Sequence, residues 1–359
     1  MRSINADLLK KMFISASNNL YNHYQEIDAL NVFPVPDGDT GSNMSMTLEN
    51  GVNEIEKKEF NDVYTLATAF SRGLLMGARG NSGVITSQIF RGFAQALEGK
   101  KTITPLLLKE AFTNGSKVAY KAVMRPVEGT ILTVIREASS ALTEIVAEED
   151  DFEKIFRGLV SEAKVALKHT PDLLPVLKEV GVVDSGGAGL VRILEGLASA
   201  LSGKVIKKKE ITGETNNKAQ QHVEHDEFGY CTEFILRLDP NNKKPFVESR
   251  FKSVLLSHGN SLVVVHDDEF VKVHVHTLNP GAVLTYGQSF GEFVKIKVEN
   301  MTEQHTSITE KQEGQVVEEV ETEEIHHEPT KELAMVAVAV GKGVEGSFKD
   351  IGVEEIISG

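Results

Sequence analysis

PVPDGDTGSN, at residues 34–43, places two aspartates on either side of a glycine. Gly38 lets the backbone turn tightly, so that the carboxylates of Asp37 and Asp39 face one point. Two carboxylates at close range repel each other unless a cation lies between them, and Mg2+ prefers such hard oxygen ligands. A plain Asp-Gly turn that caps a helix is the alternative for this motif alone. We interpret the stretch as a loop that holds divalent metal and, through it, nucleotide phosphates.

Phosphate binding is favoured by the residues that follow the loop. Thr40 and Asn43 open a helical segment, and the free N–H groups and the dipole of a helix N-terminus attract anions. GARGNSGV (77–84), PVEGTILT (126–133) and VDSGGAGL (183–190) repeat the arrangement of glycine ahead of a helix. For the first of these, a plain interhelical turn with a serine cap is the alternative. We expect the four turns to gather at one end of an up-and-down helical barrel.

Helical periodicity extends over residues 1–203, which we assign to one domain. Apolar residues recur at helical spacing in this half, as in Val63, Leu66, Ala67, Phe70, Leu74 and Leu75. Short turns rich in Gly, Pro and Asp separate the segments, and eight or nine helices fit the length. The fold class expected here is an all-α bundle or barrel.

The pattern changes after this domain. Residues 204–226 are polar without an apolar period, which is typical of a linker. Short β-branched and apolar runs at 233–238, 261–266 and 270–277 then indicate strands of a small α+β middle domain over 227–301. The protein is therefore expected to be multidomain.

An acidic tract and a short apolar segment follow the middle domain. The tract at 302–332 contains ten Glu and two Lys, and we interpret it as a disordered acidic linker, a solvating spacer rather than a specific binding element. Residues 333–340 read LAMVAVAV and indicate a buried strand. Because residues 333–359 are too few to fold alone, we expect them to begin a truncated C-terminal domain.

Composition excludes several classes of protein. The net charge of -14 and the pI near 5.3 argue against a nucleic-acid binder. The single cysteine, Cys231, cannot form an intramolecular disulfide and fits a reducing compartment. The sequence contains no signal-peptide core and no run of about 18 apolar residues, so we expect a cytoplasmic protein that is not embedded in a membrane. A GxxxxGK[ST] P-loop and the kinase HRD and DFG motifs are absent.

A second candidate site lies in the middle domain. His274 and His276 are two residues apart on an expected strand, so both imidazoles project from one face. With Cys231 they form a plausible Cys-His-His zinc set, and solvated surface histidines are the alternative.

The glycine-rich turns resemble a known family. DGDTGSNM, GARGNSGV, PVEGTILT and VDSGGAGL, in this order and spacing, are similar to the nucleotide-binding DhaL or DAK2 domain of dihydroxyacetone kinases. The longer stretches NVFPVPDGDTGSN, LLMGARGNSGVITSQIFRG and KEVGVVDSGG resemble the kinase component of bacterial fatty acid kinase, its A component, more closely still. The resemblance covers essentially the whole chain.

This resemblance implies an eight-helix barrel that binds ATP and two Mg2+ ions at one end. Asp37, Asp39 and Thr40 would then be catalytic, the two aspartates as Mg2+ ligands. Asn31 stands near the place of a third aspartate in the sugar kinases and would supply an uncharged oxygen, with Asp28 as the weaker alternative. The residues implied to contact or border the nucleotide are Asn31, Thr40, Gly41, Asn43, Gly80, Asn81, Ser82, Gly83, Thr130, Asp184 and Gly186.

The resemblance also implies zinc at Cys231, His274 and His276. Water or His266 would complete the coordination. We expect this zinc site to be structural, because the phosphoryl chemistry is placed elsewhere.

The expected activity is ATP-dependent phosphorylation of a fatty acid carboxylate to an acyl phosphate, with Arg79 or Arg72 stabilising the developing charge. The resemblance implies a DegV-like, fatty-acid-binding B subunit that presents the fatty acid. A dihydroxyacetone or polyol kinase and a nucleotide-dependent scaffold without turnover are the alternatives. The sequence leaves open whether the chain forms a homodimer.

Overall fold

The computed structural model describes residues 3–209, 229–242, 244–301, 336–339, 348 and 355–358. Eleven helices occupy the described residues ahead of the first strand. They are α1 (Ala6–Tyr21), α2 (Tyr24–Asp28), α3 (Thr40–Ile55), α4 (Val63–Gly77), α5 (Gly80–Ala96), α6 (Pro105–Ala122), α7 (Ile131–Glu148), α8 (Phe152–Lys168), α9 (Thr170–Leu173), α10 (Pro175–Val180) and α11 (Ser185–Leu201). Eight of these have 15 or more residues, in line with the eight or nine helices expected. Closure into a barrel stays a prediction.

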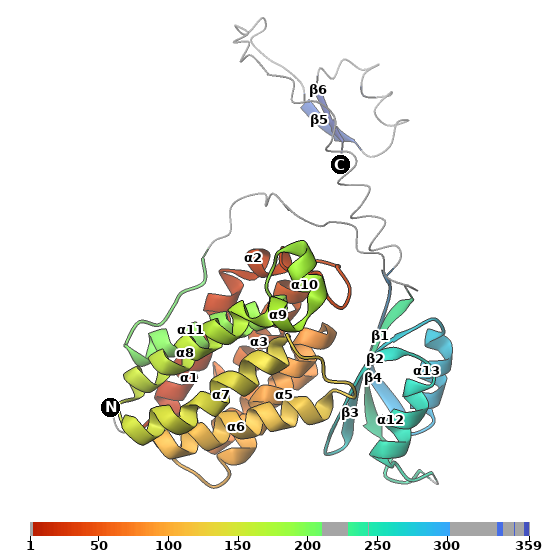
Figure 1. The fold of residues 1–359 in the computed structure, drawn as a ribbon. Coiled ribbons are helices and arrows are strands. Elements are labelled where there is room, and N and C mark those ends of the chain that lie inside the picture. The colour runs from red at the N-terminus through yellow and green to blue at the C-terminus, as the bar shows by residue number, and fades with distance from the viewer. Residues whose placement is uncertain are drawn as a thin grey trace, which may run out of the picture. The chain divides into compact units, whose positions relative to one another are not determined.

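The helical domain packs around one apolar core, as its periodicity indicates. Leu66, Phe70 and Leu74 are fully buried on one face of α4. The rings of Phe13 and Phe70 stack with their centroids 4.1 Å apart, which joins α1 to α4 at the centre of this core. Figure 1 shows the long helices running side by side in this domain.

The first residues of the predicted linker are attached to the helical domain. The side chains of Asn18 and Asn22 on α1 donate to the carbonyls of Ile206 and Lys207, each at 2.9 Å. Residues 204–209 are therefore fixed along α1, whereas residues 210–226 lie outside the described part of the chain.

The middle domain is a four-stranded antiparallel sheet with two helices. Its strands are β1 (Tyr230–Leu238), β2 (Asn260–Asp267), β3 (Phe270–Thr277) and β4 (Gly291–Asn300), in the spatial order β2-β3-β1-β4. Helices α12 (Glu248–Leu256) and α13 (Pro280–Gln288) lie along one face of the sheet (Figure 1). The α+β interpretation is confirmed, and β4 is an additional strand.

The two faces of the sheet have different neighbours. Val271, Val273 and Val275 of β3 are fully buried in a core shared with α12 and α13. Val263 and Val265 of β2 point the other way and pack with apolar residues of the helical domain. Because side chains alternate along a strand, the even-numbered residues of β3 also face the helical domain.

Two short strands lie near the end of the chain, in a unit separate from residues 1–310. Strand β5 (Val336–Ala339) pairs in parallel with β6 (Glu355–Ser358). The strand expected within 333–340 is present as β5. The acidic tract at 302–332 lies outside the described residues, and none of the described helices is long and apolar enough to span a membrane.

Close helix packing at two glycines gives a matched stability prediction. A methyl group at Gly196 on α11 would lie 2.5 Å from the backbone of Ala16 on α1, whereas at Gly158 on α8 it would meet the flexible tip of Ile145 at 2.9 Å. Both Gly→Ala changes gain up to about 1 kcal/mol of helix propensity. We expect Gly196→Ala to lower the free energy of unfolding by about 1–3 kcal/mol because backbones must separate.

Gly158→Ala should leave the free energy of unfolding unchanged or raise it slightly. Urea denaturation of both variants measures the difference. Equal effects of the two substitutions would contradict the packing argument.

Candidate functional site

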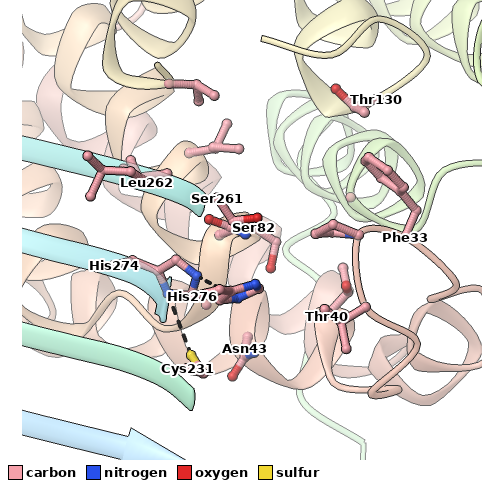
Figure 2. Close-up of a pocket in the computed structure, with 18 of the residues that line it drawn as sticks. Phe33, Thr40, Asn43, Ser82, Thr130, Cys231, Ser261, Leu262, His274 and His276 are labelled. Carbon is pink, nitrogen blue, oxygen red and sulfur yellow. Dashed lines mark hydrogen bonds between the residues drawn. The ribbon is translucent and has the colours of Figure 1, made fainter. Parts of the chain in front are cut away.

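A cavity of about 360 Å3 lies where the predicted turns of the helical domain meet the middle-domain sheet. The helical domain contributes residues from all four glycine-rich turns: Asp37, Asp39, Thr40, Asn43, Gly80, Asn81, Ser82, Thr130, Ile131, Asp184, Ser185 and Gly186. The expectation that the four turns gather at one place is therefore confirmed. Figure 2 shows Thr40, Asn43 and Ser82 on one side of this space and the strand residues on the other.

An acidic pair forms one wall of the cavity. Asp37 and Asp39 both line it, and burial together with the neighbouring Asp39 charge raises the pKa of Asp37 well above its ordinary value. The amide of Asn31, which is 3% exposed, donates to Asp37 Oδ1. Two carboxylates in such a place are stabilised by a bound cation, so these three residues fit a divalent metal.

The carboxylate of Asp28 bonds to Ser42 at the start of α3. Its two carboxylate oxygens accept from the backbone N–H and the hydroxyl of Ser42, at 3.0 and 2.6 Å. Asp28 does not line the cavity, and burial raises its pKa to about 6. The structure therefore favours Asn31 over Asp28 as the third candidate metal ligand beside Asp37 and Asp39.

The N-terminus of α5 exposes polar groups to the cavity. Asn81 and Ser82 lie in its first turn and line the cavity. The side-chain oxygen of Asn81 is buried and has no hydrogen-bond partner among the described residues. An unpaired buried acceptor costs free energy, so a bound cation or hydrogen-bond donor that contacts this oxygen would be stabilising.

Three predicted glycines differ in their surroundings. Gly80 lines the cavity and has a φ of +58°, a conformation that favours glycine. A methyl group at Gly41 would lie 2.1 Å from the carbonyl of Tyr24, and one at Gly83 would lie 2.5 Å from Thr47 Oγ1. Neither Gly41 nor Gly83 lines the cavity. The close approach that these two glycines permit in the structure is between helices, and a phosphate contact stays a prediction.

Cys231, His274 and His276 converge on the opposite wall. Their ligand atoms all lie within 4.8 Å of one another, and the two Nε2 atoms of the histidines are 3.2 Å apart. Two nitrogens on a tetrahedral zinc ion, each at about 2.0–2.1 Å from it, are about 3.3 Å apart. The separation of the two histidine nitrogens and the chemistry of the three side chains fit zinc, and Figure 2 shows the side chains grouped at the strands.

Burial and neighbouring charges together set the protonation of the two histidines. Burial opposes the charged form of His274, but the charges of Cys231 and Glu233 outweigh it and raise the pKa of His274 to about 10. Burial and the positive charge of His274 lower the pKa of His276 to about 3, so His276 is neutral and has a lone pair to donate. The salt bridge between Glu233 and His274 spans 2.8 Å.

The zinc set does not lie apart from the predicted nucleotide-facing residues. Cys231, His274 and His276 line the same cavity as Asp37 and Ser82. A purely structural role for the set stays a prediction. His266, named as a fourth ligand, contacts the carbonyl of Asp268 and the ring of Phe246 and lies outside the cluster.

Sequence reasoning missed several residues of the site. Arg125 lines the cavity, whereas Arg72 and Arg79, the arginines proposed to aid transfer, do not. Glu233 and Lys297 line it as well, from β1 and β4. The alternation of Val294, Ile296 and Val298 with lysines was the available signal for β4.

Two family models match successive parts of the chain. Residues 34–199 match the DAK2 domain, and residues 227–308 match the FakA-like middle domain, which is named after fatty acid kinase. The family resemblance stated from the motifs is confirmed by these two matches.

Relatives extend over the whole chain. Uncharacterized proteins of Staphylococcus saprophyticus, Staphylococcus epidermidis and Staphylococcus aureus are each 44% identical over 99% of this chain. The chain spans 65% of the length of these relatives.

Among solved structures, the dihydroxyacetone kinase from C. freundii in complex with AMP-PNP and Mg2+ is 20% identical. The superposition covers 55% of this chain and 34% of that one, with a TM-score of 0.42. The native form of the same kinase gives 19% identity and the same TM-score.

Asp184 gives a pH-dependent prediction. It caps α11 by accepting from Gly187 N–H at 2.6 Å, and burial raises its pKa to about 7. The folded state therefore binds more protons than the unfolded state between the unfolded value of 3.8 and about 7, so this group lowers stability as pH rises through that window. Asn caps a helix about as effectively as Asp but does not ionise. Asp184→Asn should therefore remove this loss of stability with rising pH.

The difference in free energy of unfolding, Asp184→Asn minus the unsubstituted chain, should rise by roughly 2–4 kcal/mol from pH 4 to pH 8. Denaturation at several pH values measures it. Asp62→Asn, at the cap of α4, is the matched control for the substitution itself. A difference that stays constant with pH would contradict the assignment.

Proposed function

Because the chain contains a DAK2 domain followed by a FakA-like middle domain, we propose that it is the ATP-dependent component of a fatty acid kinase, which phosphorylates a fatty acid carboxylate. The observation that supports this most is the meeting of the acidic pair and four helix N-termini in one cavity. Phosphoryl transfer depends chiefly on alignment and on neutralising charge, and these groups supply both.

The nucleotide is proposed to bind against the helical domain. Asn31, Asp37 and Asp39 would hold Mg2+, which neutralises phosphate charge when it is bound. Thr40, Asn43, Gly80, Asn81 and Ser82 would position the phosphates through hydroxyl, amide and backbone N–H groups. Gly41, Gly83, Thr130, Asp184 and Gly186 would shape the surroundings. Arg125 replaces Arg72 and Arg79 as the arginine that we propose to face the transferred group.

The acceptor is proposed to be a fatty acid presented by a lipid-binding B subunit. Its carboxylate is already ionised near pH 7 and attacks phosphorus without a general base. Apolar side chains of the middle domain, Leu256, Leu262 and Val263, line the cavity beside the polar cluster. They give an acceptor with a hydrocarbon chain a compatible surface.

Zinc is proposed to bind Cys231, His274 and His276. Three protein ligands leave a fourth position open, which is typical of zinc sites that bind water or substrate. Zinc held by these three residues would supply a Lewis acid that can polarise an oxygen. The location of these residues in the cavity supports a site that faces the reaction, in place of the closed structural site expected from the sequence.

The two alternatives make different demands on the chain. A dihydroxyacetone or polyol kinase would phosphorylate a soluble acceptor without a lipid carrier. A nucleotide-dependent scaffold would bind ATP and partners without turnover.

The first test measures phosphoryl transfer. The purified chain, extended to the full length of its relatives, should form acyl phosphate from ATP, Mg2+ and oleate loaded on a lipid-binding B subunit. Asp37→Asn should lower the rate by at least about 100-fold, since it removes charge from the metal ligands. Transfer to dihydroxyacetone but not to oleate would contradict the proposal and support the first alternative.

Asp28→Asn is the matched control for this test. This substitution changes a nearby aspartate whose oxygens accept hydrogen bonds from Ser42. We expect it to alter the stability of the chain, while phosphoryl transfer still requires Mg2+. ATP binding without turnover by the unsubstituted chain would support the scaffold instead.

The second test measures metal content. The chain should contain about one zinc ion per molecule, and Cys231→Ser or His276→Ala should lower the zinc content after dialysis, since each removes a ligand. His266→Ala is the matched control and should keep the zinc, because that histidine lies outside the cluster. Equal zinc in all four proteins, measured by mass spectrometry, would contradict the assignment.

A further inference from the structure

Glu233 accepts hydrogen bonds from both domains through one oxygen. It lies on β1 and is 5% exposed. Its Oε1 accepts from the backbone N–H of Gly80 at 2.7 Å and lies 2.8 Å from Nδ1 of His274. A single buried carboxylate thus contacts a turn of the helical domain and a member of the zinc set.

On the helical side, Glu233 serves as a cap. Helix α5 begins at Gly80, and the residue at its N-cap position, Arg79, makes no side-chain capping bond. The N–H of Gly83 is already paired with the carbonyl of Arg79. Glu233 therefore satisfies the first free N–H of α5 from another domain, and Asn81 and Ser82 follow directly along the cavity wall.

Two further bonds hold the same turn. The ammonium of Lys272, which is 4% exposed, donates to the carbonyl of Ala78. The N–H of Arg79 donates to Thr47 Oγ1 on α3 at 3.3 Å. The turn at 78–80 is therefore fixed between α3 on one side and the sheet on the other.

On the sheet side, Glu233 orients His274. Its bond occupies Nδ1, so this atom carries a proton that it donates to Glu233, and Nε2, which a bound metal would deprotonate, faces Nε2 of His276 at 3.2 Å. A carboxylate behind a histidine fixes the ring and its tautomer and strengthens the histidine as a metal ligand. Movement of the Glu233 carboxylate would therefore disturb the zinc set and the cap of α5 together.

We infer that Glu233 is a positioning residue that couples metal binding at Cys231, His274 and His276 to nucleotide binding at the N-terminus of α5. This inference rests on the proposed function for both sites. Bound metal holds the His274 ring, which keeps Glu233 where it caps Gly80 and sets the direction of the N–H groups of Asn81 and Ser82. Thermodynamic linkage then requires the nucleotide to strengthen metal binding by the same factor.

The experiment is calorimetric titration of a nonhydrolysable ATP analogue with Mg2+ into zinc-loaded and chelator-treated chain. In the unsubstituted chain, zinc should tighten nucleotide binding by at least about fivefold, the lower end of common coupling strengths. Glu233→Ala should reduce this ratio to less than about twofold, because it removes the shared carboxylate. Glu233→Gln keeps an acceptor oxygen but loses the charge-assisted bond, so its ratio should lie between the two.

Asp267→Asn is the matched control. Asp267 on β2 forms an ion pair with Arg91 of the helical domain at 2.9 Å. Like Glu233 it joins the two domains, but it belongs neither to the turn at 78–80 nor to the zinc set. This variant should keep the ratio of the unsubstituted chain. If Glu233→Ala does not fold, Glu233→Gln decides the test by whether its ratio falls below that of Asp267→Asn.

Hydrogen exchange provides a readout without nucleotide. The amide of Gly80 should exchange faster in chelator-treated than in zinc-loaded chain, and Glu233→Ala should remove this difference. Nucleotide binding that is insensitive to zinc, or equal ratios in Glu233→Ala and Asp267→Asn, would overturn the inference and leave the proposed function intact. Failure of the unsubstituted chain to bind the nucleotide or zinc would overturn both.

Discussion

Four helix N-termini facing one cavity are the constraint on which the rest of this structure depends. The positive dipole ends of α3, α5, α7 and α11 oppose one another when they meet, which costs free energy in a region of low dielectric. Carboxylates offset part of that cost: Asp184 caps α11 and Glu233 caps α5. Asp37 and Asp39 line the same cavity and add further negative charge opposite the positive helix ends. A polyphosphate with its cation would complete this balance, because each component is paired with its opposite.

The middle-domain sheet completes the cavity. Its face toward the helical domain carries Val263 and Val265, which pack with apolar helical residues, and Lys272, whose ammonium is buried against the turn at 78–80. Burying an ammonium is unfavourable, and burial lowers the pKa of Lys272 to about 8. The nearby carboxylate of Glu233 compensates by favouring the charged form. Charge and apolar packing therefore act together to hold the sheet to the helices.

The helical domain and the nucleotide-facing turns could be predicted because their signals are local. Apolar spacing around Phe70 defines a helix, and glycine ahead of Thr40 or Ser82 defines a turn at a helix start. The joining of the two candidate sites could not be predicted, since Gly80 and Glu233 are 153 residues apart and Glu233 reads as an ordinary strand residue. Gly41 and Gly83 show the same limit, because helix packing and phosphate approach both select glycine.

The distribution of charge reconciles an acidic chain with an anionic ligand. The tract at 302–332 contains more than half of the net charge of -14, and it is separated in sequence from the residues of the cavity. Arg125 and Lys297 line the cavity, where they add positive charge to the helix N-termini. Because exposed charges beyond about 10 Å are screened by salt, the field at a site follows its near neighbours more than the total. The net charge of the chain is therefore a poor guide to the electrostatic potential inside this cavity.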